Sequence, residues 1–111
     1  MNDITMPQML QEIAKKYPET AAQYSKNQQG DFIPLSYSQV FDLVLSFSAG
    51  LLSLGIGRGD KVGLISDNRK EWYHASMGIM AIGACDVPRG CDATEQDLIN
   101  ILAFAECTAA V

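Results

Sequence analysis

Hydrophobic and polar positions between residues 59 and 90 predict a strand, a helix and a second strand in succession. Residues 62–65 (Val-Gly-Leu-Ile) form a short apolar run that suits a strand covered on both faces. A polar spacer follows, then a helical pattern over residues 69–82, and then a second short strand over residues 84–87 that Pro88 closes. A unit of this size predicts a right-handed parallel crossover.

The helix predicted over residues 69–82 carries apolar residues on two stripes, so we expect it to be buried on more than one side. One stripe contains Trp72, Ala75, Ile79 and Ile82, and the other contains Tyr73, Met77, Met80 and Ala81.

The N-terminal third of the chain predicts a helix over residues 5–16, with Thr5 as its cap. Its apolar face contains Met9, Leu10, Ile13 and Ala14. Residues 19–31 are polar and predict a loop. Residues 32–35 are extended, and Pro34 places them at a sheet edge or in a small hairpin.

The longest helix is predicted over residues 36–54, because Ser36 and Gln39 have the spacing of a capping box. Its expected packing face contains Val40, Phe41, Val44, Leu45, Phe47, Leu51 and Leu52. Gly55, followed by an apolar residue, predicts a left-handed C-terminal cap.

After a loop over residues 89–93, Thr94 and Asp97 predict another capping box, for a helix that reaches Glu106. Its apolar face contains Leu98, Ile101, Leu102 and Ala105. Residues 108–111 read as the start of a further strand. We therefore expect a fragment of a larger sheet.

These elements predict an α/β fold, in which a parallel sheet with βαβ crossovers is covered in a three-layer-like arrangement. With 111 residues, the chain is one domain at most. The net charge is −5 and the eight Lys and Arg residues are scattered, so we expect no nucleic-acid partner. The N-terminus lacks the positive start of a secretory signal, which favours a cytoplasmic protein.

The three cysteines, Cys85, Cys91 and Cys107, form no CxxC pair, and His74 is the single histidine. This spacing matches no zinc pattern, so we expect no metal site. We expect the thiols to be buried or half-buried in a reducing compartment.

A candidate functional site lies at residues 66–69, where open α/β sheets place ligands at the carboxyl ends of parallel strands. Asn68 and Arg69 are the candidates for lining a cleft. The competing interpretation is that Asp67 or Asn68 caps the following helix and that Glu71 favours its positive end.

Two other patterns have structural interpretations. Gly55, Gly57 and Gly59 follow a helix and precede a strand, the reverse of a dinucleotide fingerprint, so they predict a cap and a turn. Trp72 and Tyr73 favour packing between layers, and His74, without an evident Ser, Cys or Asp partner, favours a structural or solvent-facing role.

Several pieces, taken in order, resemble the N-terminal region of adenylate-forming (AMP-binding) enzymes, and most of all the long-chain fatty-acid–CoA ligases (acyl-CoA synthetases). The resemblance covers essentially the whole chain. Its main motifs are Leu54-Gly55-Ile56, Gly59-Asp60-Lys61-Val62, Ser66-Asp67-Asn68-Arg69, Glu71-Trp72, Gly78-Ile79, Gly83-Ala84, Val87-Pro88-Arg89-Gly90 and Asp92-Ala93-Thr94.

The resemblance implies that residues 1–111 are part of the N-terminal subdomain of an enzyme that converts a carboxylate and ATP to an acyl-adenylate and then to an acyl-CoA. It implies ATP, Mg²⁺ and coenzyme A for the full-length enzyme, a fatty acid as its substrate, its remaining domains as partners, and a cytoplasmic location, with possible peripheral attachment to the membrane. The family's Ser/Thr/Gly-rich phosphate loop is absent from these 111 residues. No catalytic, cofactor-binding or metal-binding residue is therefore carried over, and we expect this chain alone to be inactive.

Three alternatives stay open. In the first, the chain is a small α/β binding module with an anion site at residues 66–69. In the second, it is a self-associating piece that pairs through open sheet edges or through the helix of residues 69–82. In the third, the parent enzyme is an aryl- or other acyl-adenylating ligase of the same superfamily.

Overall fold

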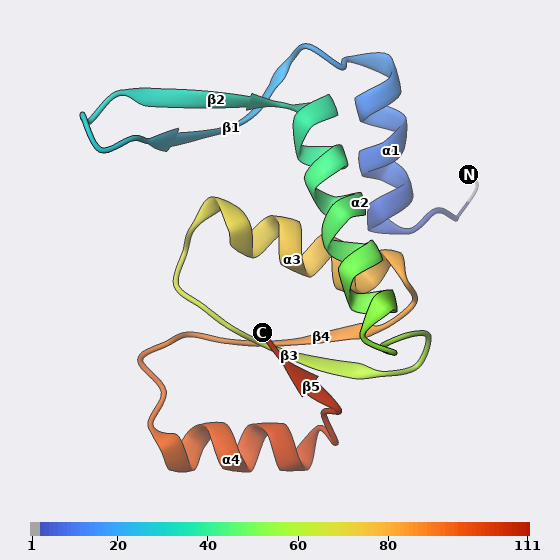
Figure 1. Cartoon of the computed structure of the whole chain (residues 1–111), viewed down its shortest axis with the longest axis vertical. Coiled ribbons are helices and arrows are strands. Elements are labelled where there is room, and N and C mark those ends of the chain that lie inside the picture. Colours follow the sequence, from blue (N-terminus) through green and yellow to red (C-terminus); the bar gives the residue numbers. More distant parts are fainter. Residues whose placement is uncertain (1–2) are drawn as a thin grey trace.

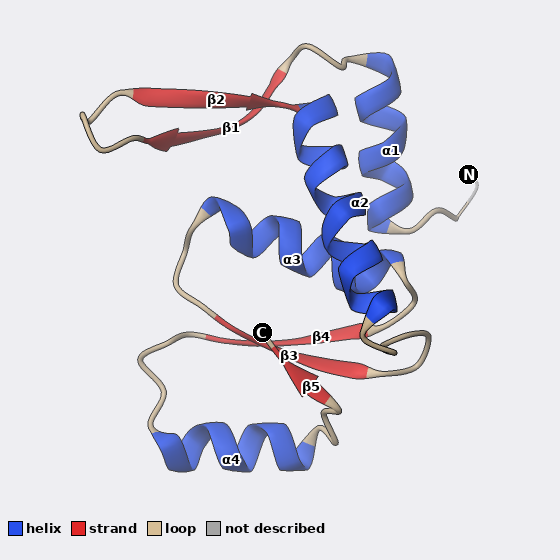
Figure 2. Cartoon of the chain, in the orientation of Figure 1, coloured by secondary structure: helices blue, strands red, loops and turns tan. Residues whose placement is uncertain are grey.

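The structure is a computed structural model that describes residues 3–111. Figures 1 and 2 show a β-hairpin beside helices at one end of the molecule and a small sheet between helices at the other end. In chain order the elements are α1 (Met6–Lys16), β1 (Ala21–Lys26), β2 (Phe32–Ser36), α2 (Tyr37–Ser53), β3 (Lys61–Ile65), α3 (Lys70–Ala81), β4 (Cys85–Arg89), α4 (Glu95–Phe104) and β5 (Ala109–Ala110).

The central sheet has the strand order β4-β3-β5, and both pairings are parallel. Val62 of β3 is in register with Asp86 on one side and with Ala109 on the other. Figure 1 shows α2 and α3 over one face of this sheet and α4 under the other. The predicted α/β fold with a parallel sheet and covering helices is confirmed.

Two clusters of buried side chains form the core. One lies between α1, α2 and α3 and contains Leu10, Val40, Val44 and Met77. The other joins α2 and α3 to the sheet and contains Leu51, Val62, Ile79 and Ala84. Helix α3 belongs to both clusters, and its residues from His74 to Ile79 are all buried, as its two apolar stripes predict.

Local capping follows the sequence closely at three helices. Ser36 with Gln39 and Thr94 with Asp97 form the predicted capping boxes, and Thr5 forms a third with Gln8. After α2, Gly55 has a φ of 85°, as predicted, and the amide of Ile56 donates to the carbonyl of Leu51.

The loop predicted over residues 19–31 is wrong in part, because residues 21–26 form β1. This strand pairs antiparallel with β2, so Pro34 does lie in a small hairpin, opposite Tyr24. β1 has the sequence AAQYSK, without alternating apolar and polar residues and without a fully buried residue, so its strand conformation depends on pairing with β2.

Two further expectations need correction. Pro88 lies inside β4 instead of closing it, since β4 is an edge strand of the three-stranded sheet and needs no proline N–H on its outer side. Leu45 and Leu52, assigned to the packing face of α2, are 49% and 56% exposed, while Ser48 is buried there instead. The predicted apolar face of α4 is confirmed, because Leu98, Ile101, Leu102 and Ala105 are half-buried while the other residues of the helix are exposed.

Candidate functional site

The segment of residues 66–69 joins the carboxyl end of β3 to the start of α3, as the sequence predicts. Two open grooves meet at this segment. The first, which we call the charged groove, has a volume of about 660 Å³ and is lined by Ser25, Lys26, Ile65, Ser66, Asp67, Asn68, Arg69, Lys70, Glu71 and Cys91. The second, the apolar groove, measures about 580 Å³ and is lined mainly by Leu43, Phe47, Leu64, Trp72, Ala75 and Val111, with Ser66 and Arg69 at its polar side.

Arg69 lines both grooves, and its charge is matched within its own segment. Its Nε atom donates to a carboxylate oxygen of Glu71 at 2.9 Å, while both side chains stay about half exposed or more. This hydrogen bond raises the pKa of Arg69 and lowers the pKa of Glu71. A guanidinium already bound to a carboxylate offers a weaker attraction for an anionic ligand than a free one.

The interpretation that Asp67 or Asn68 caps α3 is wrong. Arg69 itself occupies the N-cap position, with extended backbone angles (φ −149°, ψ 162°), and no side chain caps the helix within the described residues. Asp67 and Asn68 therefore lie too early in the chain to reach the free amides of the first turn. Both side chains remain exposed and line the charged groove.

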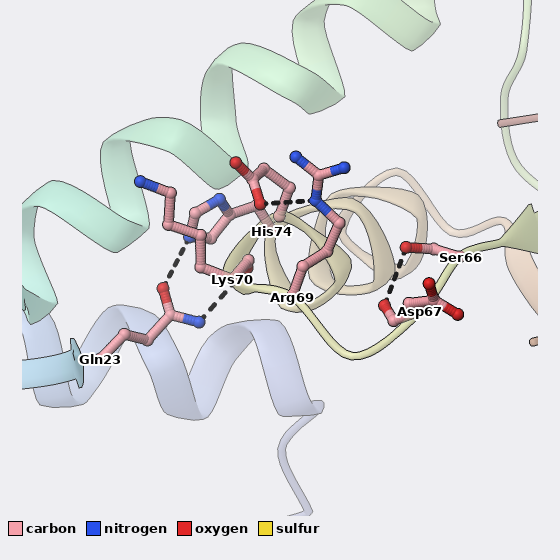
Figure 3. Close-up of polar contacts among 7 residues, drawn as sticks. Gln23, Ser66, Asp67, Arg69, Lys70 and His74 are labelled. Carbon is pink, nitrogen blue, oxygen red and sulfur yellow. Dashed lines mark hydrogen bonds and ion pairs between the residues drawn. The ribbon is translucent and has the colours of Figure 1, made fainter. Parts of the chain in front are cut away.

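Asp67 instead makes contacts across the groove. The Sγ atom of Cys91, in the loop after β4, donates to its carboxylate, and this hydrogen bond raises the pKa of the thiol. Ser66 donates to the backbone carbonyl of Asp67 at 2.9 Å, as Figure 3 shows. A thiol held protonated in this way is a poorer nucleophile at neutral pH.

The expectation of buried or half-buried thiols holds for Cys107 alone. Cys85 and Cys91 are exposed, Cys85 on the edge strand β4 and Cys91 in the loop that follows it. Sequence reasoning missed this because exposure depends on which side of the sheet edge each residue faces.

His74 has a partner that the sequence gave no reason to choose. Its Nε2 atom lies 2.8 Å from Oε1 of Gln23 in β1, and the amide nitrogen of Gln23 donates to the Lys70 carbonyl at 3.3 Å (Figure 3). Because that amide nitrogen faces Lys70, its oxygen faces the ring, and Nε2 of His74 carries the proton. Burial lowers the pKa of His74, which favours the neutral imidazole.

Of the two aromatic residues of α3, Tyr73 packs between layers as expected, while Trp72 is half-buried and faces a groove. Trp72 lines the apolar groove, and Tyr73 packs against the cluster of Leu10 and Met77. Burial raises the pKa of the Tyr73 phenol. Met77 is a core residue and Met80 packs beside it.

The site therefore combines an apolar groove with a charged groove whose acids and bases largely neutralise one another. Within residues 3–111, no three His, Cys, Asp or Glu side chains gather into a set that could hold a metal ion. In the same residues, the helices are too short or too polar to span a bilayer.

The fold resembles that of solved N-terminal domains of adenylating enzymes. The N-terminal domain of FACL13 from Mycobacterium tuberculosis superposes with a TM-score of 0.87 at 24% identity, over 97% of this chain and 27% of that one. NpsA from Klebsiella oxytoca, solved with 3-hydroxyanthranilyl-AMSN, superposes with a TM-score of 0.88 at 21% identity, over 98% of this chain and 21% of that one. The chain therefore has the fold of these N-terminal domains.

Sequence comparison gives the family. Residues 10–111 match the model of the AMP-binding enzyme family, and the chain belongs to it. The long-chain-fatty-acid–acyl-carrier-protein ligase AEE15 of Arabidopsis thaliana is 35% identical over 79 residues, which cover 71% of this chain and 11% of that protein. A substituted propanoyl:CoA ligase of Rhodococcus jostii is 33% identical over 107 residues, which cover 96% of this chain and 20% of that protein. The chain thus spans about a tenth to a fifth of the length of these relatives.

Proposed function

We propose that this chain is the N-terminal portion of an ATP-dependent long-chain fatty-acid–CoA ligase and that it provides a structural layer rather than reacting groups. The observation that carries the proposal is the match over residues 10–111 to the AMP-binding family. Relatives named as long-chain fatty-acid ligases or synthetases support the choice of substrate class, among them ACSBG2 of Rattus norvegicus at 32% identity.

The geometry of the site supports a structural role. Cys91 bonds to Asp67 and His74 to Gln23, which joins distant segments, while Arg69 pairs with Glu71 within its own segment. The reactive side chains of the region are therefore engaged with one another. On this proposal ATP, Mg²⁺, coenzyme A and the fatty acid act on the complete enzyme, through residues outside this chain. We also propose a cytoplasmic location, with peripheral attachment to a membrane as a property of the complete enzyme.

A graft tests the proposal. The matching segment of the Rhodococcus jostii ligase is removed and replaced by this chain, and formation of the CoA ester is measured with the recipient's own acid. We expect the recipient without the segment to be inactive, and the graft to restore activity with the recipient's acid preference. A graft that folds cooperatively but stays inactive, or that changes the preferred acid, would contradict a structural role.

An aryl-adenylating ligase is the second candidate, and the superposition with NpsA, solved with an aryl-AMSN compound, favours it. Grafting the chain into both NpsA and ACSBG2 of Rattus norvegicus, which is named as a long-chain-fatty-acid–CoA ligase, separates the two candidates. If the contacts with the rest of the enzyme are of the fatty-acid type, the ACSBG2 graft regains the larger fraction of its recipient's activity. The reverse order would favour the aryl candidate.

The binding module and the self-associating piece are separate proposals. For the first, the pairing of Arg69 with Glu71 leads us to expect no saturable binding of ATP, coenzyme A or phosphate by the isolated chain. For the second, α3 is largely buried, so the surfaces left for pairing are the outer edges of β4 and β5. Isothermal titration and sedimentation velocity measure these two properties.

A further inference from the structure

The β1–β2 hairpin forms one wall of the charged groove. Ser25 and Lys26 of β1 line it opposite residues 66–70 of the segment that leads into α3. In Figure 1 the hairpin extends from the α1–α2 end of the molecule over the start of α3. The position of the hairpin therefore sets the width of the groove.

The outer part of the hairpin has little support from the core. Tyr24 and Phe32 are 65% and 64% exposed, and Ile33 is 44% exposed. The ammonium group of Lys26 lies 5.2 Å from the centroid of the Phe32 ring, a contact that joins the two strands to each other. Because an isolated two-stranded hairpin is only marginally stable in water, this part needs a tether to keep a fixed position.

The inner end of the hairpin is firmly anchored. Ala22 and Leu35 pack against the core cluster of α1, α2 and α3, and the amide of Tyr37 donates to the carbonyl of Thr20 at 2.9 Å. These contacts hold the base of the hairpin in place. The base is therefore the point about which the outer part of the hairpin can turn.

A β-bulge lies where the anchored and unsupported parts meet. The strand register shifts between Ala21 and Gln23. In a regular strand Ala22 and Gln23 would point to opposite faces, but here Ala22 packs on the core while Gln23 bonds to α3. Bulges re-aim side chains in this way.

Gln23 uses both ends of its amide on α3, accepting from Nε2 of His74 at 2.8 Å and donating to the Lys70 carbonyl at 3.3 Å (Figure 3). Within residues 3–111, these are the side-chain hydrogen bonds that join the hairpin to α3. We propose that the β1–β2 hairpin is a hinged flap over the charged groove and that Gln23 is the latch that holds it closed. The inference does not depend on the proposed function.

Opening this flap changes the charge of the groove as well as its width. Lys26 is carried on the flap, while Asp67 and Glu71 belong to the opposite wall. The opposite wall also holds Arg69 and Lys70, whose charges balance those two carboxylates. Release of Gln23 therefore moves one cation away and leaves the open groove less positive than the closed one.

Hydrogen exchange of the chain, followed by mass spectrometry, tests the latch. Gln23→Ala removes both bonds, and Gln28→Ala, at the exposed tip of the same hairpin, is the matched control. We expect Gln23→Ala to speed exchange about five-fold or more in residues 24–33 and in the first turn of α3, the change that loss of one or two hydrogen bonds produces. Peptides of α1, α2 and α4 should exchange as in the parent chain.

A second variant distinguishes the loss of the hydrogen bonds from a simple loss of packing. Gln23→Met keeps the bulk of the side chain and removes its polar atoms, so it isolates the hydrogen bonds. The rate at which a bulky maleimide alkylates Cys91, divided by the rate for Cys85 on the edge strand of the same molecule, gives an independent measure of groove width. We expect both variants to raise this ratio of rates. The proposal would be overturned if both variants left the exchange rates and the alkylation ratio unchanged. It would also be overturned if both variants raised the exchange rates equally in all helices.

Discussion

The hydroxyl of Ser48 donates a hydrogen bond of 2.8 Å to the backbone carbonyl of Gly78, at the point where α2 crosses α3. A Cβ atom placed on Gly78 would lie 2.7 Å from Cδ1 of Phe47 and 3.3 Å from the carbonyl oxygen of Val44. The two helices therefore approach to a distance that only a residue without a side chain allows. This crossing supports α3, whose first turn forms a wall of the charged groove.

Gly78→Ala should destabilise the chain by about 1–3 kcal/mol, because the new methyl must displace both an aromatic ring and a backbone carbonyl. Gly50→Ala in α2 is the matched control, since no atom lies within 4 Å of its added Cβ. That control should be neutral or stabilise the helix by about 0.5–1 kcal/mol. Urea unfolding monitored by circular dichroism measures both free energies, and equal effects of the two substitutions would refute the close crossing.

Gly63→Ala should loosen α4 from the sheet. A Cβ atom on Gly63 in β3 would lie 2.5 Å from Cδ2 of Leu102, so the substitution should cost about 1–3 kcal/mol of unfolding free energy. Leu102→Ala opens space for the new methyl. In a double-mutant cycle, Gly63→Ala should therefore cost clearly less in the Leu102→Ala background, and strictly additive effects would show that the two residues do not touch in solution.

The stability of the chain should fall as the pH drops below about 6.5, the ordinary pKa of histidine. Burial lowers the pKa of His74 in the folded state, so the unfolded chain takes up a proton at higher pH than the folded chain does. The stabilisation is complete above the unfolded pKa and is lost as the pH falls through the folded pKa. Neighbouring Glu71 opposes this shift and Lys70 adds to it.

The measurement is the free energy of urea unfolding between pH 7.5 and 5, in the parent chain and in His74→Gln. Because His74 is the single histidine of the sequence, the variant should lose the part of the pH dependence that lies above the range of the carboxylates. An identical pH profile in the two proteins would exclude His74 as its source.

Features that depend on neighbours along the chain were predictable. The capping boxes at Ser36 and Thr94 and the left-handed turn at Gly55 each involve groups a few residues apart, and the structure contains all of them. The parallel pairing of β3 with β4 was also predictable, because its apolar runs flank a helix of crossover length.

Features that depend on distant segments were not. Strand β1 has no strand signal of its own, and Gln23 meets His74 across 51 positions of sequence. The start of α3 shows the same limit. Asp67 and Asn68 are good capping residues by type, but the segment leaving β3 places Arg69 at the N-cap.

The sequence by itself determined the order of the helices and of the strands other than β1, the ends of most helices and the α/β class, because these follow from local hydrogen bonding and from the spacing of apolar residues. Only the tertiary structure decided which polar side chains meet at the groove, how closely α2 approaches α3, and that the hairpin lies over the start of α3. Those relations join segments far apart in the chain, and their geometry is set by how the layers pack rather than by the preference of any residue for its own conformation.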